Sequence, residues 1–318
     1  MAGHSLDAIA NPDGRLAVLA MDQRATLRRM LDGAGTPSTD ADLAAFKVDV
    51  VRALGPLSTG VLLDPDFGVG PVRDAGALPA GVGLLVAAEP VLKAKWNDEI
   101  RTTVDPERGA THVLDHGGDA LKFLVQWRPG RPAADGEPDL ADEALTATAS
   151  VIADCAQAGV PSVIEPLIAR LPGEAPFTPE IAAPVVIESA RQMAALEPDL
   201  LKLEWPGSAD GCRRVSEALG NVPWALLSAG VGIDEFLARV EIALDAGAVG
   251  FIAGRAIWGE AVALEGEERV SFLRETAVPR LAALCEVLAE HGRSWREVAG
   301  EAQTLSGARA VDVTDSPS

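Results

Sequence analysis

Residues 199–207 read DLLKLEWPG, a short apolar run that carries one lysine and stops at Pro206 and Gly207. Such a run between helical patterns is typical of a strand in a parallel sheet or barrel, because those strands are buried on both faces. Side chains alternate along a strand, so we expect Lys202 and Glu204 on one face. An ammonium group is costly to bury. Lys202 is therefore either half of a structural Lys–Glu pair or a reactive amine that forms a Schiff base.

Seven further apolar runs alternate with helical patterns along the chain. The predicted strands lie at 17–21, 60–64, 82–89, 120–127, 161–166, 223–230 and 249–254. Helical periodicity is found at 25–32, 40–54, 139–158, 178–196, 209–219, 233–246 and 268–290. Eight strands alternating with helices predict an α/β fold, a (β/α)8 TIM barrel. An open doubly wound sheet is the alternative, but no GxGxxG follows the first strand to support it.

The length and composition of the chain suit one large core. With 318 residues, of which 48% are hydrophobic, the chain falls within the range of single-domain α/β barrels. No long linker or break in composition divides it. We expect one barrel domain over residues 1–304 and a disordered tail over residues 305–318.

The charge balance bears on the partners of the protein. Lys and Arg number 27 and Asp and Glu number 47, so the formal charge of −20 disfavours nucleic acid and anionic membranes. Three widely spaced cysteines suggest neither a disulfide framework nor a zinc cluster, which fits a reduced cytoplasm. The N-terminus lacks a signal sequence, and no apolar run reaches the roughly 18 residues of a membrane span. We expect a cytoplasmic homo-oligomer that binds a small molecule.

Polar side chains follow the predicted strands at the ends where a barrel carries out its chemistry. In chain order they are Asp22, Gln23, Arg24, Asp64, Glu89, Lys122, Glu165, Lys202, Glu204, Ser228 and Arg255. Two lysines inside one barrel disfavour each other's protonation, which leaves an amine free to attack a carbonyl. Glu165, on the strand between them, is expected to move protons, to neutralise a lysine, or to do both. The polar segment with Trp96 and Arg101 is expected to form an active-site loop.

Two loops near the end of the predicted barrel favour an anion site. SAGVG (228–232) and AGRAIWG (253–259) each join a strand to a helix. Their glycines could simply turn the chain, but barrels often bind phosphate with the loops after strands seven and eight. Ser228 and Arg255 add a hydroxyl and a guanidinium to these loops. A phosphorylated or otherwise anionic ligand is therefore expected.

The histidines do not suggest a metal site. His112 and His116 stand four residues apart and are expected to be solvated rather than to bind zinc. His4 and His291 lie near the two ends of the chain. A zinc-dependent carbonyl lyase is disfavoured, and we expect neither a metal nor a cofactor.

Seven stretches, in the same order, resemble the class I aldolases that include tagatose-1,6-bisphosphate aldolase and sulfofructosephosphate aldolase. They are AMDQRATLRRML (20–31), LLDPDFG (62–68), DALKFLVQWR (119–128), VIEP (163–166), LLKLEWPG (200–207), LLSAGV (226–231) and AGRAIWG (253–259). VIEP and QWR look closer to the sulfofructosephosphate branch, whereas LLDPDFG looks closer to the tagatose-bisphosphate branch.

The resemblance implies a metal-free retro-aldol reaction. Lys202 matches the Schiff-base lysine, and Lys122 and Glu165 match groups that assist proton transfer. The remaining matches line the pocket, and we count Asp22 as catalytic and Gln23, Arg24, Asp64, Ser228, Gly230, Gly254 and Arg255 as substrate-binding. The implied products are dihydroxyacetone phosphate and an aldehyde.

The candidate substrates differ in the anionic group that their sixth carbon carries. We expect 6-deoxy-6-sulfofructose 1-phosphate, which gives sulfolactaldehyde, with Arg24, Arg101 and Arg128 as candidate contacts for the C6 anion. The alternatives are tagatose 1,6-bisphosphate, which gives glyceraldehyde 3-phosphate, and a non-catalytic barrel that binds sugar phosphates. Another phosphate-binding barrel enzyme without a covalent intermediate is also open.

Overall fold

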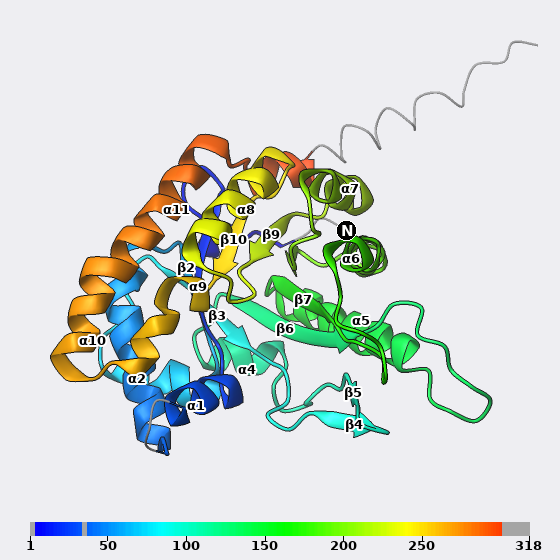
Figure 1. Ribbon diagram of the computed structural model, residues 1–318, viewed down its shortest axis with the longest axis horizontal. Helices are drawn as coiled ribbons and strands as arrows, with labels where there is room; N and C mark the ends of the chain where they lie inside the picture. The colour runs from blue at the N-terminus through cyan, green and yellow to red at the C-terminus, as the bar shows by residue number, and fades with distance from the viewer. Residues whose placement is uncertain (1–3, 34–36, 301–318) are drawn as a thin grey trace, which may run out of the picture.

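Eight parallel strands close into a barrel in the computed structural model, which describes residues 4–33 and 37–300 (Figure 1). They are β1 (Leu16–Met21), β2 (Gly60–Leu63), β3 (Gly83–Ala87), β6 (Ala120–Trp127), β7 (Ser162–Ile168), β8 (Leu200–Leu203), β9 (Trp224–Leu227) and β10 (Gly250–Ala253). β10 pairs with β1, so the predicted (β/α)8 barrel is confirmed and the open sheet is excluded. The tail predicted at 305–318 lies outside the described residues.

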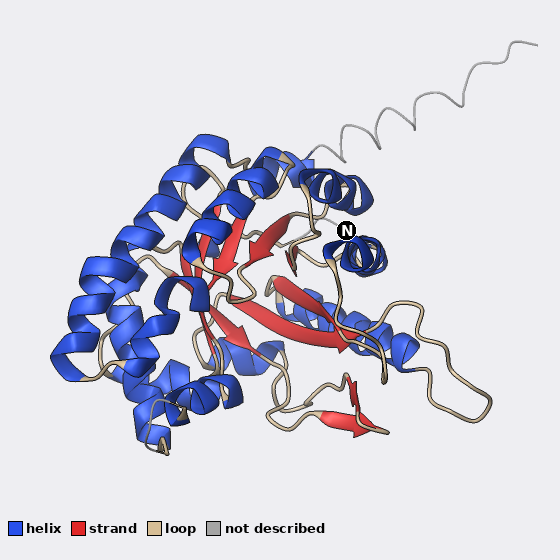
Figure 2. Ribbon diagram, viewed as in Figure 1, coloured by secondary structure: helices blue, strands red, loops and turns tan. Residues whose placement is uncertain are grey.

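Helices cover the outside of the barrel (Figure 2). They are α1 (Ala25–Asp32), α2 (Asp40–Leu54), α3 (Gly70–Asp74), α4 (Ala110–Asp115), α5 (Leu140–Ala158), α6 (Pro179–Ala194), α7 (Ala209–Leu219), α8 (Ile233–Asp245), α9 (Arg255–Trp258), α10 (Gly266–Phe272) and α11 (Val278–His291). The long helix predicted at 268–290 is divided by a π-helical turn, Leu273–Ala277, between α10 and α11. No helix in the described part of the chain is long and apolar enough to cross a lipid bilayer.

The barrel interior changes from apolar to charged along the strands. Near their amino ends, alternate residues such as Val18, Leu200 and Val163 form an apolar cluster separate from the larger core beneath the helices. Two residues further along the same faces lie the ionisable groups Lys202 and Glu165. Because side chains alternate along a strand, the same face carries both sets. The apolar floor thus holds the charged layer at the carboxyl ends of the strands.

The polar segment after β3 forms a small hairpin of its own. β4 (Ala94–Trp96) pairs antiparallel with β5 (Glu99–Arg101), apart from the barrel strands (Figure 1). Arg101 turns outward and makes two hydrogen bonds of 2.7 Å to Glu143 on α5. The segment predicted as an active-site loop therefore directs this arginine toward a surface helix and away from the barrel mouth.

Candidate active site

Glu165 bridges the two lysines inside the barrel. Its Oε1 atom lies 2.8 Å from Lys202 Nζ, and its Oε2 atom lies 2.8 Å from Lys122 Nζ. The three side chains come from the neighbouring strands β6, β7 and β8, and each residue is less than 10% exposed: 1% for Lys122, 7% for Glu165 and 4% for Lys202. The structure thus brings together the three residues predicted to share the chemistry. It also shows that Lys202 pairs with Glu165 and not with Glu204.

Lys122 lies among three carboxylates. Asp22 Oδ2 is 2.8 Å from its amine and Glu89 Oε1 is 3.2 Å away, in addition to Glu165. Burial alone lowers the pKa of Lys122, but Asp22, Glu165 and Glu89 outweigh it and hold that pKa well above its ordinary value. The expectation that the two lysines disfavour each other's protonation is therefore wrong for Lys122, which is a fixed cation.

Asp22 forms an ion pair with the Lys122 ammonium group. Burial alone raises its pKa, but Lys122 and then Lys202 outweigh burial, so the pKa of Asp22 falls below its ordinary value. Asp22 therefore stays ionised beside Lys122, within reach of the charge of Lys202. Its expected catalytic role remains a prediction.

A cavity of about 240 Å³ opens above Lys202 and Glu165. Its polar lining comes from the loops and strands predicted to meet there: Gln23, Glu165, Lys202, Glu204, Ser228, Gly254 and Arg255. Ala20, Leu167, Leu227, Ala229 and Ile252 complete the wall. A molecule in this cavity contacts the amine of Lys202 and the two glycine-containing loops at once.

The loops after β9 and β10 pack directly on each other. Gly230 has a φ of +79°, and a Cβ atom there would lie 3.3 Å from Arg255 Cζ. A Cβ atom on Gly254 would lie 2.4 Å from the carbonyl oxygen of Ala20, so only glycine fits that position. Arg255 makes no ion pair with a carboxylate in residues 4–33 or 37–300. Its guanidinium is available to an anion in the cavity.

Three arginines predicted to hold a second anion are already paired. Arg24 lies 2.9 Å from Asp66, and its NH2 group donates to the carbonyl oxygen of Glu89. Arg128 lies 2.8 Å from Glu174, and Arg101 is bound to Glu143. None of the three lines the cavity. Arg24, predicted to bind substrate, instead pairs with Asp66 and lies 3.8 Å from Glu89, one of the three carboxylates around Lys122.

Asp64 is also removed from the cavity, which corrects its predicted role in binding substrate. The side chain is fully buried and forms an ion pair with the equally buried Lys47. Its other oxygen accepts from the backbone N–H groups of Asp66 and Phe67, at 3.1 and 2.7 Å, and caps the turn Pro65–Val69. Asp64 therefore anchors the loop after β2 to α2.

Sequence reasoning missed Lys47, although a signal was present. Lys47 stands on the buried stripe of α2, together with Leu43, Phe46, Val50, Val51 and Leu54. A lysine at such a position needs a buried partner. The partner is Asp64, and the Lys47 amine also donates to the backbone carbonyl oxygens of Met21 and Gln23. Lys47 thereby fixes the end of β1, where the predicted site begins.

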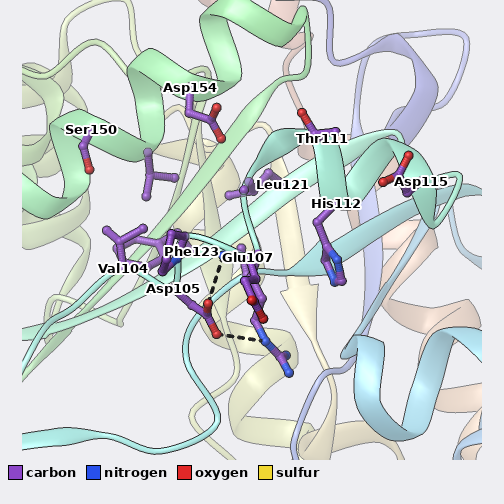
Figure 3. A pocket seen from close by; sticks show the side chains of 15 residues that line it. Val104, Asp105, Glu107, Thr111, His112, Asp115, Leu121, Phe123, Ser150 and Asp154 are labelled. Carbon is purple, nitrogen blue, oxygen red and sulfur yellow. Dashed lines mark hydrogen bonds and ion pairs between the residues drawn. The ribbon is translucent and has the colours of Figure 1, made fainter.

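A larger cavity lies elsewhere, on the outside of the barrel. It has a volume of about 490 Å³ and lies between α4, α5 and the outer face of β6 (Figure 3). His112 projects into it, whereas Leu121 and Phe123 form its floor. Among the described residues, no three His, Cys, Asp or Glu side chains are grouped so as to hold a metal ion. This cavity contains none of the residues predicted for the reaction.

The sequence was compared with family models and with known proteins. A family model described as DeoC/LacD family aldolase matches residues 16–260. Tagatose 1,6-diphosphate aldolase 2 of Enterococcus faecalis is 25% identical, over 92% of this chain and 94% of that protein. Tagatose 1,6-diphosphate aldolase of Listeria monocytogenes is 27% identical, over 85% of each chain.

Solved structures agree on the fold. An archaeal fructose 1,6-bisphosphate aldolase superposes with a TM-score of 0.59 at 19% identity, over 88% of this chain and 96% of that chain. The fructose-bisphosphate aldolase from Slackia heliotrinireducens gives a TM-score of 0.60 at 19% identity, over 89% and 87%. At this level of identity the likeness concerns the arrangement of strands and helices.

Proposed function

The chain belongs to the DeoC/LacD family of aldolases, and from that membership we propose that it cleaves a ketohexose 1-phosphate through a Schiff base at Lys202. Membership makes the protein a class I aldolase, an aldehyde-lyase. The observation that carries the proposal for Lys202 is the ion pair of 2.8 Å with Glu165, beside a cavity that also contains Arg255. The alternative of a non-catalytic barrel that binds sugar phosphates is disfavoured, because the matching family is a family of aldolases.

The proposed reaction begins with the C1 phosphate on the loops of Ser228, Gly230, Gly254 and Arg255. Glu165 Oε1 takes the proton that Lys202 must lose, and the free amine adds to the C2 ketone. Loss of water gives an iminium ion, and Glu165, which lines the open cavity, releases to solvent the proton that it took from Lys202. Glu165 then accepts the proton of the C4 hydroxyl as the C3–C4 bond breaks and the iminium takes the electron pair.

Lys122 supports these steps without forming a bond to the substrate. Its amine lies 2.8 Å from Glu165 and stays protonated, because three carboxylates surround it. A fixed positive charge there stabilises the ionised form of Glu165 before it accepts a proton. After cleavage, protonation of the enamine and hydrolysis of the imine release dihydroxyacetone phosphate.

Two substrates fit this scheme, and different observations favour them. Tagatose 1,6-bisphosphate is favoured by the names of the curated relatives, which align over most of this chain. The sulfonate 6-deoxy-6-sulfofructose 1-phosphate is favoured by charge, because Arg24, Arg101 and Arg128 are all neutralised by carboxylates. A sulfonate carries one negative charge, whereas a phosphate carries close to two and benefits from more free cations.

The choice of substrate is tested by measuring kcat/KM for both compounds on one preparation. A tenfold preference corresponds to about 1.4 kcal/mol of transition-state stabilisation. A preference of that size for the bisphosphate excludes the sulfosugar as substrate and leaves the aldolase proposal intact. The opposite preference assigns the sulfosugar.

The Schiff base is tested by borohydride reduction in the presence of dihydroxyacetone phosphate, followed by peptide mass mapping. We expect one reduced adduct, on Lys202. Lys202→Met, treated identically, is the matched control and is expected to carry none. An adduct on Lys122 or on a surface lysine in the wild-type protein, or no adduct at all, overturns the proposal.

A further inference from the structure

Glu204 is an acidic residue in the candidate active site, and the proposed cleavage reaction assigns no role to it. It follows β8 and lines the same cavity as Lys202 and Glu165. Its Oε2 atom accepts a hydrogen bond of 2.8 Å from the backbone N–H of Ile168. No lysine, arginine or histidine of the described chain forms an ion pair with it. One oxygen is thus held by the backbone, and the other is left for the contents of the cavity.

We propose that Glu204 is the general acid–base residue for making and hydrolysing the imine on Lys202. The inference rests on the Schiff-base chemistry proposed above and adds a residue to it. Glu204 stands two residues after Lys202 on the same face, which places it roughly 6 to 7 Å nearer the barrel mouth. A ketose whose C2 atom reaches the amine and whose phosphate reaches Ser228 passes this carboxyl group.

Glu165 is poorly suited to the same task. Both of its oxygens are occupied by ammonium groups, each at 2.8 Å. An oxygen that already accepts from an ammonium group is placed to take the proton of that group, as Glu165 does from Lys202, and not to deliver a proton to the C2 oxygen. Glu204 has the opposite surroundings, since its fixed partner is a single backbone N–H. The two carboxyl groups of one cavity are thereby divided into a base and an acid.

The electrostatics of the cavity agree with this division. Burial, opposed by the Ile168 N–H and assisted by the charge of Glu165, raises the pKa of Glu204 to about 6. The charged groups that line the same cavity are Glu165 from β7, Lys202 from β8 and Arg255 from α9. A group with such a pKa supplies and recovers a proton near neutral pH.

The proton transfers balance in both directions. When the Lys202 amine has added to C2, the C2–O bond of the carbinolamine breaks and the hydroxyl leaves as water with the proton of Glu204. The nitrogen lone pair forms the C=N bond, and Glu204 remains as a carboxylate. In hydrolysis of the product imine, a water molecule adds to C2 and gives its proton to Glu204.

Glu204→Gln tests this role, because glutamine keeps the size and can still accept from the Ile168 N–H. The measured quantity is the rate of imine formation on Lys202 with dihydroxyacetone phosphate, followed by rapid quenching with borohydride between pH 5 and 9. For the wild-type protein we expect the rate to fall as the pH rises through about 6, because the protonated form of Glu204 is the active one. In Glu204→Gln we expect this decrease to be absent and the rate to be roughly 10²-fold lower.

Two further variants separate catalysis from folding. Glu204→Asp retains a titratable group and is expected to recover the pH dependence, at a reduced rate. Glu217→Gln removes the same charge from an exposed position on α7 and is expected to leave both rate and profile unchanged. If the decrease with pH persists in Glu204→Gln, or if that variant forms the imine at the wild-type rate, the inference is overturned while the proposed function stands. If wild-type Lys202 forms no adduct, both fall together.

Discussion

Replacing Glu165 by glutamine tests the central contact of the site. The carboxylate accepts from Lys122 and Lys202 at 2.8 Å each, and both residues are almost completely buried. Glutamine has one acceptor oxygen and one NH2 group, so only one lysine keeps an acceptor. The other ammonium faces a donor, and no group remains to take the C4 hydroxyl proton.

The expected loss follows from these contacts. A positioned acid–base group contributes roughly 10²- to 10⁴-fold to a rate, which corresponds to about 2.7 to 5.4 kcal/mol of transition-state stabilisation. We therefore expect kcat of Glu165→Gln to fall within that range. Lys122 still forms ion pairs with Asp22 at 2.8 Å and Glu89 at 3.2 Å, so the fold is expected to survive.

The assay separates cleavage from imine formation. Steady-state cleavage is followed by coupled detection of dihydroxyacetone phosphate, and the Lys202 imine is trapped separately with borohydride. We expect trapping to persist in Glu165→Gln at a lower rate, because Lys202 then loses its proton to solvent, while turnover falls further. Near-normal turnover would reduce Glu165 to a charge partner of the lysines and refute the reasoning. Circular dichroism and thermal melting of the same samples exclude unfolding as the cause of any loss.

Three further predictions concern the rest of the site. Arg255→Ala is expected to weaken binding of the phosphorylated substrate by about 1.5 to 3 kcal/mol, the usual value of a hydrogen bond to a charged group, and an unchanged KM would place the phosphate elsewhere. Arg128→Ala, which removes a guanidinium paired with Glu174 outside the cavity, is the matched control. Asp64→Asn is expected to lower the free energy of unfolding by about 3 to 5 kcal/mol in urea titrations, because it leaves the buried Lys47 without its carboxylate, whereas KM stays the same. A raised KM with unchanged stability would return Asp64 to the substrate. EDTA is expected to leave the cleavage rate unchanged; strong inhibition reversed by a divalent metal would contradict the Schiff-base mechanism.

Much of the barrel was readable from local patterns. Each strand was visible as an apolar run, and the two loops SAGVG and AGRAIWG marked the last strand ends. Closure of a barrel brings the carboxyl ends of all its strands to one mouth, so the sequence alone predicts that Lys122, Glu165 and Lys202 converge. They do converge, because their strands are neighbours in the barrel.

The choice of partner for each charged side chain was decided only by the tertiary structure. The alternation of side chains along β8 and just beyond it placed Glu204 on the same face as Lys202, but the amine of Lys202 pairs with Glu165 on the neighbouring strand β7. Asp64 stands at a strand end like the candidate catalytic residues, yet it turns toward Lys47 on a helix 17 positions earlier in the chain. With 47 acidic residues available to 27 basic ones, local sequence leaves many pairings open. Packing selects among them, because a buried charge must find its partner within a few ångströms in three dimensions, whatever their separation along the chain.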